Sequence, residues 1–197
     1  MLMDVKPVTL SGRFVKLVPM ELGHIDAFIE IGLGHDLFRW FPWAIDTPHQ
    51  MRAYIGGALA MRDAGQVVPF TTIEQATGEI VGSTCFLAID KANRRLEIGA
   101  TWLAPRWQRT ACNTEAKFLQ LRHCFEELGC VRVEFKTDAL NEPSRKAMKR
   151  IGAVEEGTFR QHMICPGGRL RDSVYFSVID RDWPAVKSRL ETLLAKS

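Results

Sequence analysis

The sequence predicts an α+β fold, with a mixed, mostly antiparallel twisted sheet, one parallel strand pair and helices on both faces. Three strand-like segments separated by short polar turns occupy residues 67–103, which is typical of an antiparallel meander. A helical pattern then separates the segment 95–103 from an alternating strand at 131–138. We expect these two strands to run parallel, because a helical crossover joins parallel neighbours. Two final strands flank PGGR at 166–169, which predicts a hairpin.

Length and composition indicate one globular domain covering residues 1–197. The sequence has no internal repeat and no low-complexity linker, and its hydrophobic content of 46% is ordinary for such a domain. A net charge of +3 is too small to indicate nucleic-acid binding. No apolar run approaches the ~20 residues that a membrane span requires. The first residues also lack the basic-then-apolar order of a signal peptide. We therefore expect a cytoplasmic protein that binds neither nucleic acid nor membrane.

The elements before the meander follow from local patterns. Residues 11–20 alternate apolar and basic side chains and predict a first strand. Residues 21–33 place four apolar side chains on one helical face. Thr47 before Pro48 predicts the start of a second helix that ends near Gly65. Threonine is a good N-cap and proline fits the first helical turn.

After the meander, the apolar spacing changes from that of a strand to that of a helix. Four apolar residues recur at helical spacing: Phe118, Leu121, Phe125 and Leu128. Gly129 predicts the end of that helix. A short basic helix is expected at 142–151, ending at Gly152, and a last helix at about 182–195.

An aromatic segment lies between the first two predicted helices. Phe38, Trp40, Phe41 and Trp43 fall within six residues around Pro42. Two interpretations are open. The segment either fills a gap in the hydrophobic core or forms a wall of a substrate pocket, since binding pockets are rich in aromatic side chains.

Cysteine and histidine spacing does not indicate a metal site. The five cysteines include no CxxC pair, and the five histidines include no HxH or HExxH pattern. We expect no bound metal. Cys112 alone lies in a suggestive place, the turn before a helix, where a thiolate could be stabilised. Packing as a small side chain is the alternative.

The turn between 103 and 114 is a candidate anion site. A strand gives way there to a helix N-terminus, whose free amides and positive dipole end suit phosphate. Asn113 or Thr114 is expected to cap the helix, and Arg106 and Arg109 add positive charge. An ordinary capped helix without a ligand is the alternative.

Three stretches resemble a known family. They are LEIGATWL at 96–103, NTEAKFLQLRHCFEELGCVRVEFKTDALNEPSRKAMKRIGA at 113–153, and RDSVYFSVIDRDWPAV at 171–186. Together they cover about half of the chain and resemble the GNAT acyltransferase superfamily, in particular the branch with the ribosomal-protein N-terminal (alanine) acetyltransferases. The resemblance implies a GNAT-like fold whose parallel strands splay apart, with acetyl-CoA as co-substrate.

The resemblance also implies where acetyl-CoA lies. The pantetheine arm would pair with the backbone of Trp102, Leu103 and Ala104. The pyrophosphate would lie on the following turn, at Gln108, Arg109, Thr110, Ala111, Cys112, Asn113 and Thr114. In the superfamily this turn is usually Gln/Arg-x-x-Gly-x-Gly/Ala, but residues 108–113 contain no glycine. Side chains at Arg109 and Ala111 are expected to restrict the backbone there. Whether the turn still binds CoA tightly therefore stays open.

A second polar corner follows the strand 131–138. Asn141 and Ser144 resemble the pair that grips the pantetheine and faces the thioester in this branch. Many superfamily members use a tyrosine to protonate the departing thiolate, but Tyr54 and Tyr175 lie on other segments. Ser144 is therefore the candidate donor to the departing sulfur. Lys146, next to this pair, either reaches the CoA phosphates or belongs to a solvated face.

An attacking amine must also lose a proton. Glu97 resembles the family's acid at this position and is the candidate base, acting through water. The alternative is a cross-strand ion pair of Glu97 with Arg94 or Arg132.

These observations predict an N-acetyltransferase. The acetyl group would pass from acetyl-CoA to a primary amine, on a protein N-terminus or a small molecule, by direct attack and without an acyl-enzyme. The alternative is a non-catalytic acyl-CoA-binding or protein-interaction module on the same fold. The edge of the final hairpin leaves a homodimer open.

Overall fold

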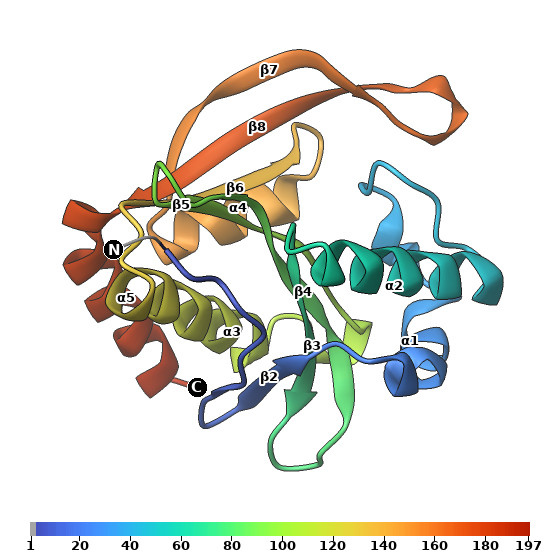
Figure 1. The fold of residues 1–197 in the computed structure, drawn as a ribbon, viewed down its shortest axis with the longest axis horizontal. Helices are drawn as coiled ribbons and strands as arrows, with labels where there is room; N and C mark the ends of the chain where they lie inside the picture. Colours follow the sequence, from blue (N-terminus) through green and yellow to red (C-terminus); the bar gives the residue numbers. More distant parts are fainter. Residues whose placement is uncertain (1–2) are drawn as a thin grey trace.

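The computed structural model describes residues 3–197, in which eight strands form one open sheet in the order β1-β2-β3-β4-β5-β6-β8-β7. The strands are β1 (Leu10–Ser11), β2 (Val15–Pro19), β3 (Val68–Glu74), β4 (Ile80–Asp90), β5 (Arg95–Leu103), β6 (Arg132–Asp138), β7 (Val154–Ile164) and β8 (Leu170–Ile179). The α-helices are α1 (Ile25–Gly32), α2 (Pro48–Asp63), α3 (Ala111–Arg122), α4 (Glu142–Ile151) and α5 (Trp183–Ala195) (Figure 1). The α+β fold class is confirmed.

The predicted parallel pair is β5 and β6, and every other pair of neighbouring strands is antiparallel. The parallel ladder is short and ends where Glu97 faces Glu134. Beyond that point β5 continues to Leu103 and β6 to Asp138 without pairing with each other, although β5 stays paired with β4 and β6 with β8. The expected splay of the two strands is therefore present.

A β-bulge explains why β5 turns away from β6. On β4, Ser83 faces Trp102, but Cys85 faces Gly99, so β5 holds one extra residue in this interval. Ala100 within it has a left-handed backbone, with φ of 48°. A bulge bends its strand and disrupts the local ladder. The bend opens a gap beside Gly99 and Ala100.

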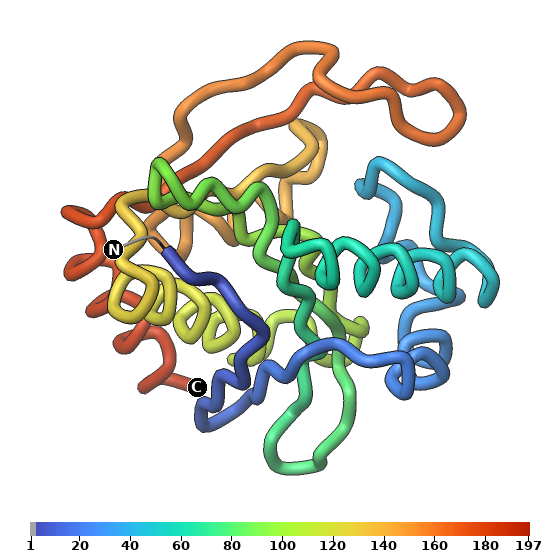
Figure 2. Tube along the Cα trace, in the orientation of Figure 1, coloured from blue at the N-terminus to red at the C-terminus, as the bar shows by residue number. Residues whose placement is uncertain are grey.

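Two hydrophobic clusters lie on the two faces of the sheet. The larger joins the sheet to α3 and α5 and includes Leu96, Ile98, Leu119, Phe135, Phe176 and Leu190. The smaller joins α1 and α2 to the sheet through Phe28, Met51, Ile55 and Trp102. Figures 1 and 2 show α3 beside α5 at one end of the molecule and α1 beside α2 at the other. Strand β5 thus contributes to both clusters.

Several boundaries differ from the expected ones. The first strand, expected at 11–20, is divided into β1 and β2, which pair with each other. Strand β7 begins at Val154, and the hairpin tip at Pro166–Gly168 is a short 3-10 turn. The start of α2 is as expected, because Thr47 caps it and accepts a hydrogen bond from the Gln50 amide. Helix α3 continues as a π-helical turn at His123–Glu127.

Strand β7 forms a free edge of the sheet. Its residues are almost all exposed, including Phe159 at 57% and Ile164 at 73%. The tube in Figure 2 shows the β7–β8 hairpin extending over the rest of the chain. A homodimer through this edge stays a prediction. In residues 3–197, no helix combines the length and apolar character needed to cross a bilayer.

Candidate active site

A cavity of about 210 Å³ lies where β5 and β6 diverge. Its walls come from six parts of the chain: the segment before α2, strand β4, the bulge of β5, the end of β6, helix α4 with its cap, and the β7–β8 hairpin. The polar side chains that line it are Glu97, Thr101, Lys136, Thr137, Asp138, Asn141, Ser144 and Arg171. Both predicted catalytic residues, Glu97 and Ser144, therefore face one cavity, although they lie far apart in the sequence.

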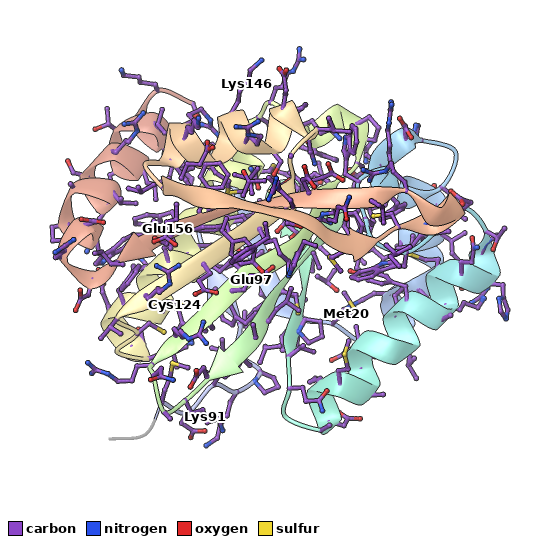
Figure 3. The ribbon with its side chains drawn as sticks, turned by 90° about the horizontal axis from the view of Figure 1, so that it is seen from above. Met20, Lys91, Glu97, Cys124, Lys146 and Glu156 are labelled. Atoms are coloured by element: carbon purple, nitrogen blue, oxygen red, sulfur yellow. The ribbon has the colours of Figure 1, made fainter. Side chains whose placement is uncertain are left out.

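Glu97 is a buried carboxylate beside a cation. It is 5% exposed, and its Oε2 lies 3.3 Å from Lys136 Nζ on the neighbouring strand. Burial raises the pKa of Glu97, and the charge of Lys136 partly opposes that rise. Figure 3 shows Glu97 in the middle of the sheet. The ion-pair alternative named the wrong partners, because Arg132 instead pairs with Glu134 and Glu156.

Ser144 and Asn141 lie at the first turn of α4. The Asn141 Oδ1 caps this helix by accepting a hydrogen bond from the Ser144 amide at 3.1 Å. The Ser144 hydroxyl forms no hydrogen bond within residues 3–197, so it is free to donate into the cavity. Neither Tyr54 nor Tyr175 lines the cavity. The catalytic role of Ser144 stays a prediction.

The aromatic segment serves both the core and the cavity. Trp40, Phe41 and Trp43 line the cavity. Phe38 does not; it is 6% exposed and packs edge-to-face on Trp102, with ring centres 5.2 Å apart. The two interpretations of this segment thus apply to different residues, because one side of the loop faces the smaller core. Contact of these rings with a substrate stays a prediction.

The predicted pantetheine-binding backbone, Trp102–Ala104, lies at the end of β5. All three side chains are buried. The carbonyl of Leu103 accepts a hydrogen bond from Gln108 Nε2 at 3.1 Å, and the Ala104 amide donates to the Val81 carbonyl. Gln108 therefore ties the anion turn to the end of the strand.

Arg109 takes the backbone conformation that a glycine would favour. Its φ is 61°, in the left-handed region, which costs a residue with a Cβ about 1 kcal/mol. The turn is nevertheless open to solvent: Gln108, Arg109 and Thr110 are exposed, and Arg109 forms no ion pair in the described part of the chain. Free amides at the start of a 12-residue helix together with this guanidinium fit a pyrophosphate.

The expected cap of α3 was wrong. Neither Asn113 nor Thr114 caps the helix; Thr110 does, accepting a hydrogen bond from the Cys112 amide at 3.3 Å. Thr114 is buried and accepts a hydrogen bond from Arg150 Nη2 at 2.9 Å. Cys112 is also buried, and burial raises the pKa of its thiol. This favours the packing interpretation of Cys112, and Ala111 opens the helix beside it.

Lys146 stands on the outer face of α4. It is exposed, pairs with Glu142 at 3.0 Å and does not line the cavity (Figure 3). Arg145 beside it pairs with Glu155. These contacts favour the solvated-face interpretation, and a contact of Lys146 with CoA phosphates stays a prediction.

Four polar residues in or behind the cavity wall, the half-buried Lys136 and the buried Asp138, Arg171 and Lys117, were not singled out from the sequence. Lys136, Asp138 and Arg171 line the cavity, and Lys117 lies behind its wall, where its Nζ is 2.7 Å from Thr101 Oγ1. The alternation of β6 could have indicated Lys136, since it shares a strand face with Glu134 and Asp138. No local signal identifies the others, because their burial depends on helix docking and on the pairing of β6 with β8. In residues 3–197, no cluster of three or more His, Cys, Asp or Glu side chains could hold a metal ion.

Comparisons with known proteins agree with this architecture. YdaF of Bacillus subtilis, described as a candidate ribosomal N-acetyltransferase, is 34% identical over 110 residues, which cover 56% of this chain and 59% of YdaF. The match thus spans less than two thirds of that relative.

Solved structures match over nearly the whole chain. A candidate acetyltransferase from T. thermophilus is 35% identical with a TM-score of 0.88, covering 98% of this chain and 100% of that one. Mycobacterium smegmatis RimJ, solved in complex with CoA-disulfide, shares the fold with a TM-score of 0.79 at 24% identity, covering 95% of each chain. The family model described as an acetyltransferase (GNAT) domain matches residues 15–154. This chain therefore belongs to the GNAT acetyltransferase family.

Proposed function

We propose that this protein is an N-acetyltransferase that moves the acetyl group of acetyl-CoA to a primary amine by direct attack. The observation that carries the proposal is the single cavity of about 210 Å³ that Glu97 and Ser144 share at the mouth of the splayed strands. An acid and a base facing one small, partly closed space are what a transfer from a thioester to an ammonium group requires.

Each residue has a distinct part in the proposed reaction. Bound acetyl-CoA supplies the acetyl group as a thioester. Glu97 would accept a proton from the acceptor ammonium through water, which leaves the nitrogen lone pair free to attack the thioester carbon. The C–N bond would form as the C–S bond breaks, and the remaining excess proton on nitrogen would pass to the departing sulfur. Ser144 donates a hydrogen bond to the sulfur as negative charge develops on it. The turn Gln108–Thr114 and Asn141 hold the donor in place.

Substitution of Ser144 tests its role. Thiol release from acetyl-CoA would be followed with a panel of amines and N-terminal peptides. In Ser144→Ala we expect kcat to fall about 100-fold or more, the usual contribution of a positioned proton donor. Ser188→Ala removes an exposed hydroxyl from α5 and should leave kcat unchanged. Full activity in Ser144→Ala would remove Ser144 from the mechanism.

Calorimetry with acetyl-CoA separates the enzyme from a non-catalytic module. Binding of acetyl-CoA together with amine-dependent thiol release supports the enzyme. Binding without thiol release for any amine supports an acyl-CoA-binding module. No binding at millimolar ligand contradicts both and leaves a protein-interaction role.

A further inference from the structure

We propose that Arg171 selects acceptors that carry a carboxylate close to the reacting amine. The inference rests on the proposed function and adds the chemical class of its acceptor. The carboxylate has two possible sources, the α-carboxylate of a free amino acid and the acidic side chain of a peptide's first residue.

Arg171 is held rigidly in the cavity wall. It lies on β8 and is 4% exposed. Its Nε donates to Ser173 Oγ at 3.1 Å, and its Nη1 donates to the Trp40 carbonyl at 3.2 Å. Its Nη2 forms no hydrogen bond within residues 3–197. The Nη2 group of a fixed guanidinium is therefore free to donate to a ligand in the cavity that Arg171 lines.

The charge of Arg171 is incompletely matched by the protein. The nearest carboxylate is Asp138, but its Oδ2 lies 3.9 Å from Arg171 Nε and only 2.7 Å from Arg169 Nη2. The other oxygen of Asp138 accepts the Leu140 amide at 2.9 Å. Arg169 thus holds Asp138 more closely than Arg171 does.

The other two charged residues that line the cavity form an ion pair with each other. Lys136 and Glu97 face each other at 3.3 Å. Among the described residues, Arg171 therefore has no carboxylate closer than Asp138 at 3.9 Å, and Arg169 holds that carboxylate at 2.7 Å. A buried charge without a close partner is unfavourable, and guanidinium groups form strong hydrogen bonds to carboxylates. An anionic group on the ligand is the natural partner.

The position of Arg171 relative to Glu97 limits the acceptor further. Glu97 and Arg171 both line this cavity. The cavity of about 210 Å³ is not much larger than one of roughly 150 Å³ that holds a benzene-sized molecule. An amine at Glu97 and an anion at Arg171 must therefore belong to the same small end group.

Matched acceptors test the proposal in the wild-type protein. One arm compares thiol release with a free L-amino acid and with its α-amide. The other compares amidated peptides whose first residue is aspartate or asparagine. We expect kcat/KM to favour the carboxylate at least about tenfold in one arm, since a buried charged hydrogen bond discriminates by that factor. The arm that shows it identifies the source. Equal kcat/KM within both pairs would overturn the proposal.

Variants then assign the preference to Arg171. In Arg171→Gln the preference should fall below about twofold, while neutral acceptors are still acetylated. Arg171→Lys keeps the charge and should retain part of the preference, which protects the test if the glutamine variant does not fold. Arg160→Gln, an exposed arginine of β7 that does not line the cavity, should keep it in full. An unchanged preference in a folded Arg171→Gln protein would overturn the assignment.

A failure of the proposed function can be distinguished from a failure of the inference about Arg171. In that case no amine, charged or neutral, releases thiol. Calorimetry with the same matched compounds still tests Arg171: tighter binding of the carboxylate supports the inference, and equal binding contradicts it.

Discussion

Glu97 and Lys117 are both buried charged residues, and burial moves their pKa values in opposite directions. Burial raises the pKa of the Glu97 carboxyl, and it lowers the pKa of Lys117 to about 7. In both cases a low-dielectric environment disfavours the ionised form. The first shift affects the proton transfer that we propose, whereas the second affects the stability of the wall behind it.

The pKa of Glu97 sets the acidic limb of the proposed reaction. A base works only when ionised, so kcat/KM should rise with pH as Glu97 loses its proton. Lys136→Met removes the cation that lowers the pKa of Glu97, so the limb should move to higher pH. Lys91→Met, which removes an exposed lysine from the β4–β5 turn, should leave it in place. An unmoved limb in Lys136→Met would argue against Glu97 as the base.

Lys117 should make folding stability depend on pH. Its ammonium is held by Thr101, Thr84 and Gln120 oxygens at 2.7, 3.2 and 3.3 Å, with no carboxylate partner in the described residues. Below pH 7 the lysine is protonated in both states and its desolvation cost is fully present. Between about 7 and its ordinary value of 10.5 the unfolded chain binds a proton that the folded chain has lost, so the free energy of unfolding rises with pH.

Lys117→Met isolates this effect. The variant should be more stable than wild type near pH 6, by on the order of 5 kcal/mol at most, and its advantage should shrink steadily towards pH 10. Urea unfolding at a series of pH values measures the difference, with Lys91→Met as an exposed control. A difference that does not change with pH would mean that Lys117 keeps an ordinary pKa in the folded protein.

At the scale of elements, one carboxylate joins helix α3 to the N-terminal hairpin. The buried Glu115 accepts hydrogen bonds from the backbone amides of Arg13, Phe14 and Val15 at 2.8, 2.6 and 2.7 Å. A Cβ on Gly12 would lie too close to the Glu115 carboxyl group, so a side chain at this position would displace the carboxyl group from its present place. The contact fixes α3, whose first turn is the candidate pyrophosphate site.

Removal of this carboxylate should destabilise the fold. Glu115→Ala leaves three amides without an acceptor, which should cost about 3 kcal/mol or more. For a chain of this size the unfolding midpoint should fall by roughly 6–12 °C. Scanning calorimetry measures the fall, and Glu191→Ala, an exposed site on α5, is the control. Hydrogen exchange at Arg13–Val15 should accelerate as well. A fall no larger than that of the control would contradict the proposed link.

The elements were more predictable from the sequence than their contacts. Apolar spacing located the helices and strands, and the helix between β5 and β6 predicted the parallel pair, because these signals are local. The cap at Thr110 was missed because Asn113 and Thr114 are equally good capping types. The Lys136 partner of Glu97 depends on the register of β6 beside β5, and the burial of Arg171 depends on the pairing of β8 with β6. No local pattern encodes either.

At the scale of the whole molecule, the two ends of the proposed donor site lie on different parts of the fold. Ser144 lies in the first turn of α4 at the cavity, whereas Thr110 caps the start of α3, and both helices pack into the larger hydrophobic cluster. A donor that spans both should therefore stabilise the whole domain and not only one loop. The pyrophosphate end and the thioester end of the donor should each make a separate contribution to this stabilisation.

Ligand-dependent melting tests this arrangement. Acetyl-CoA at about 100 times its Kd should add roughly 2.7 kcal/mol, or about 5–10 °C in the unfolding midpoint. S-acetylpantetheine at the same concentration should add much less, because it lacks the pyrophosphate that the 108–114 turn would bind. Arg109→Gln keeps the left-handed backbone position but removes the charge, so it should narrow the gap between the two ligands, while Arg160→Gln should not. If both ligands stabilise the wild-type protein equally, the pyrophosphate does not lie on this turn.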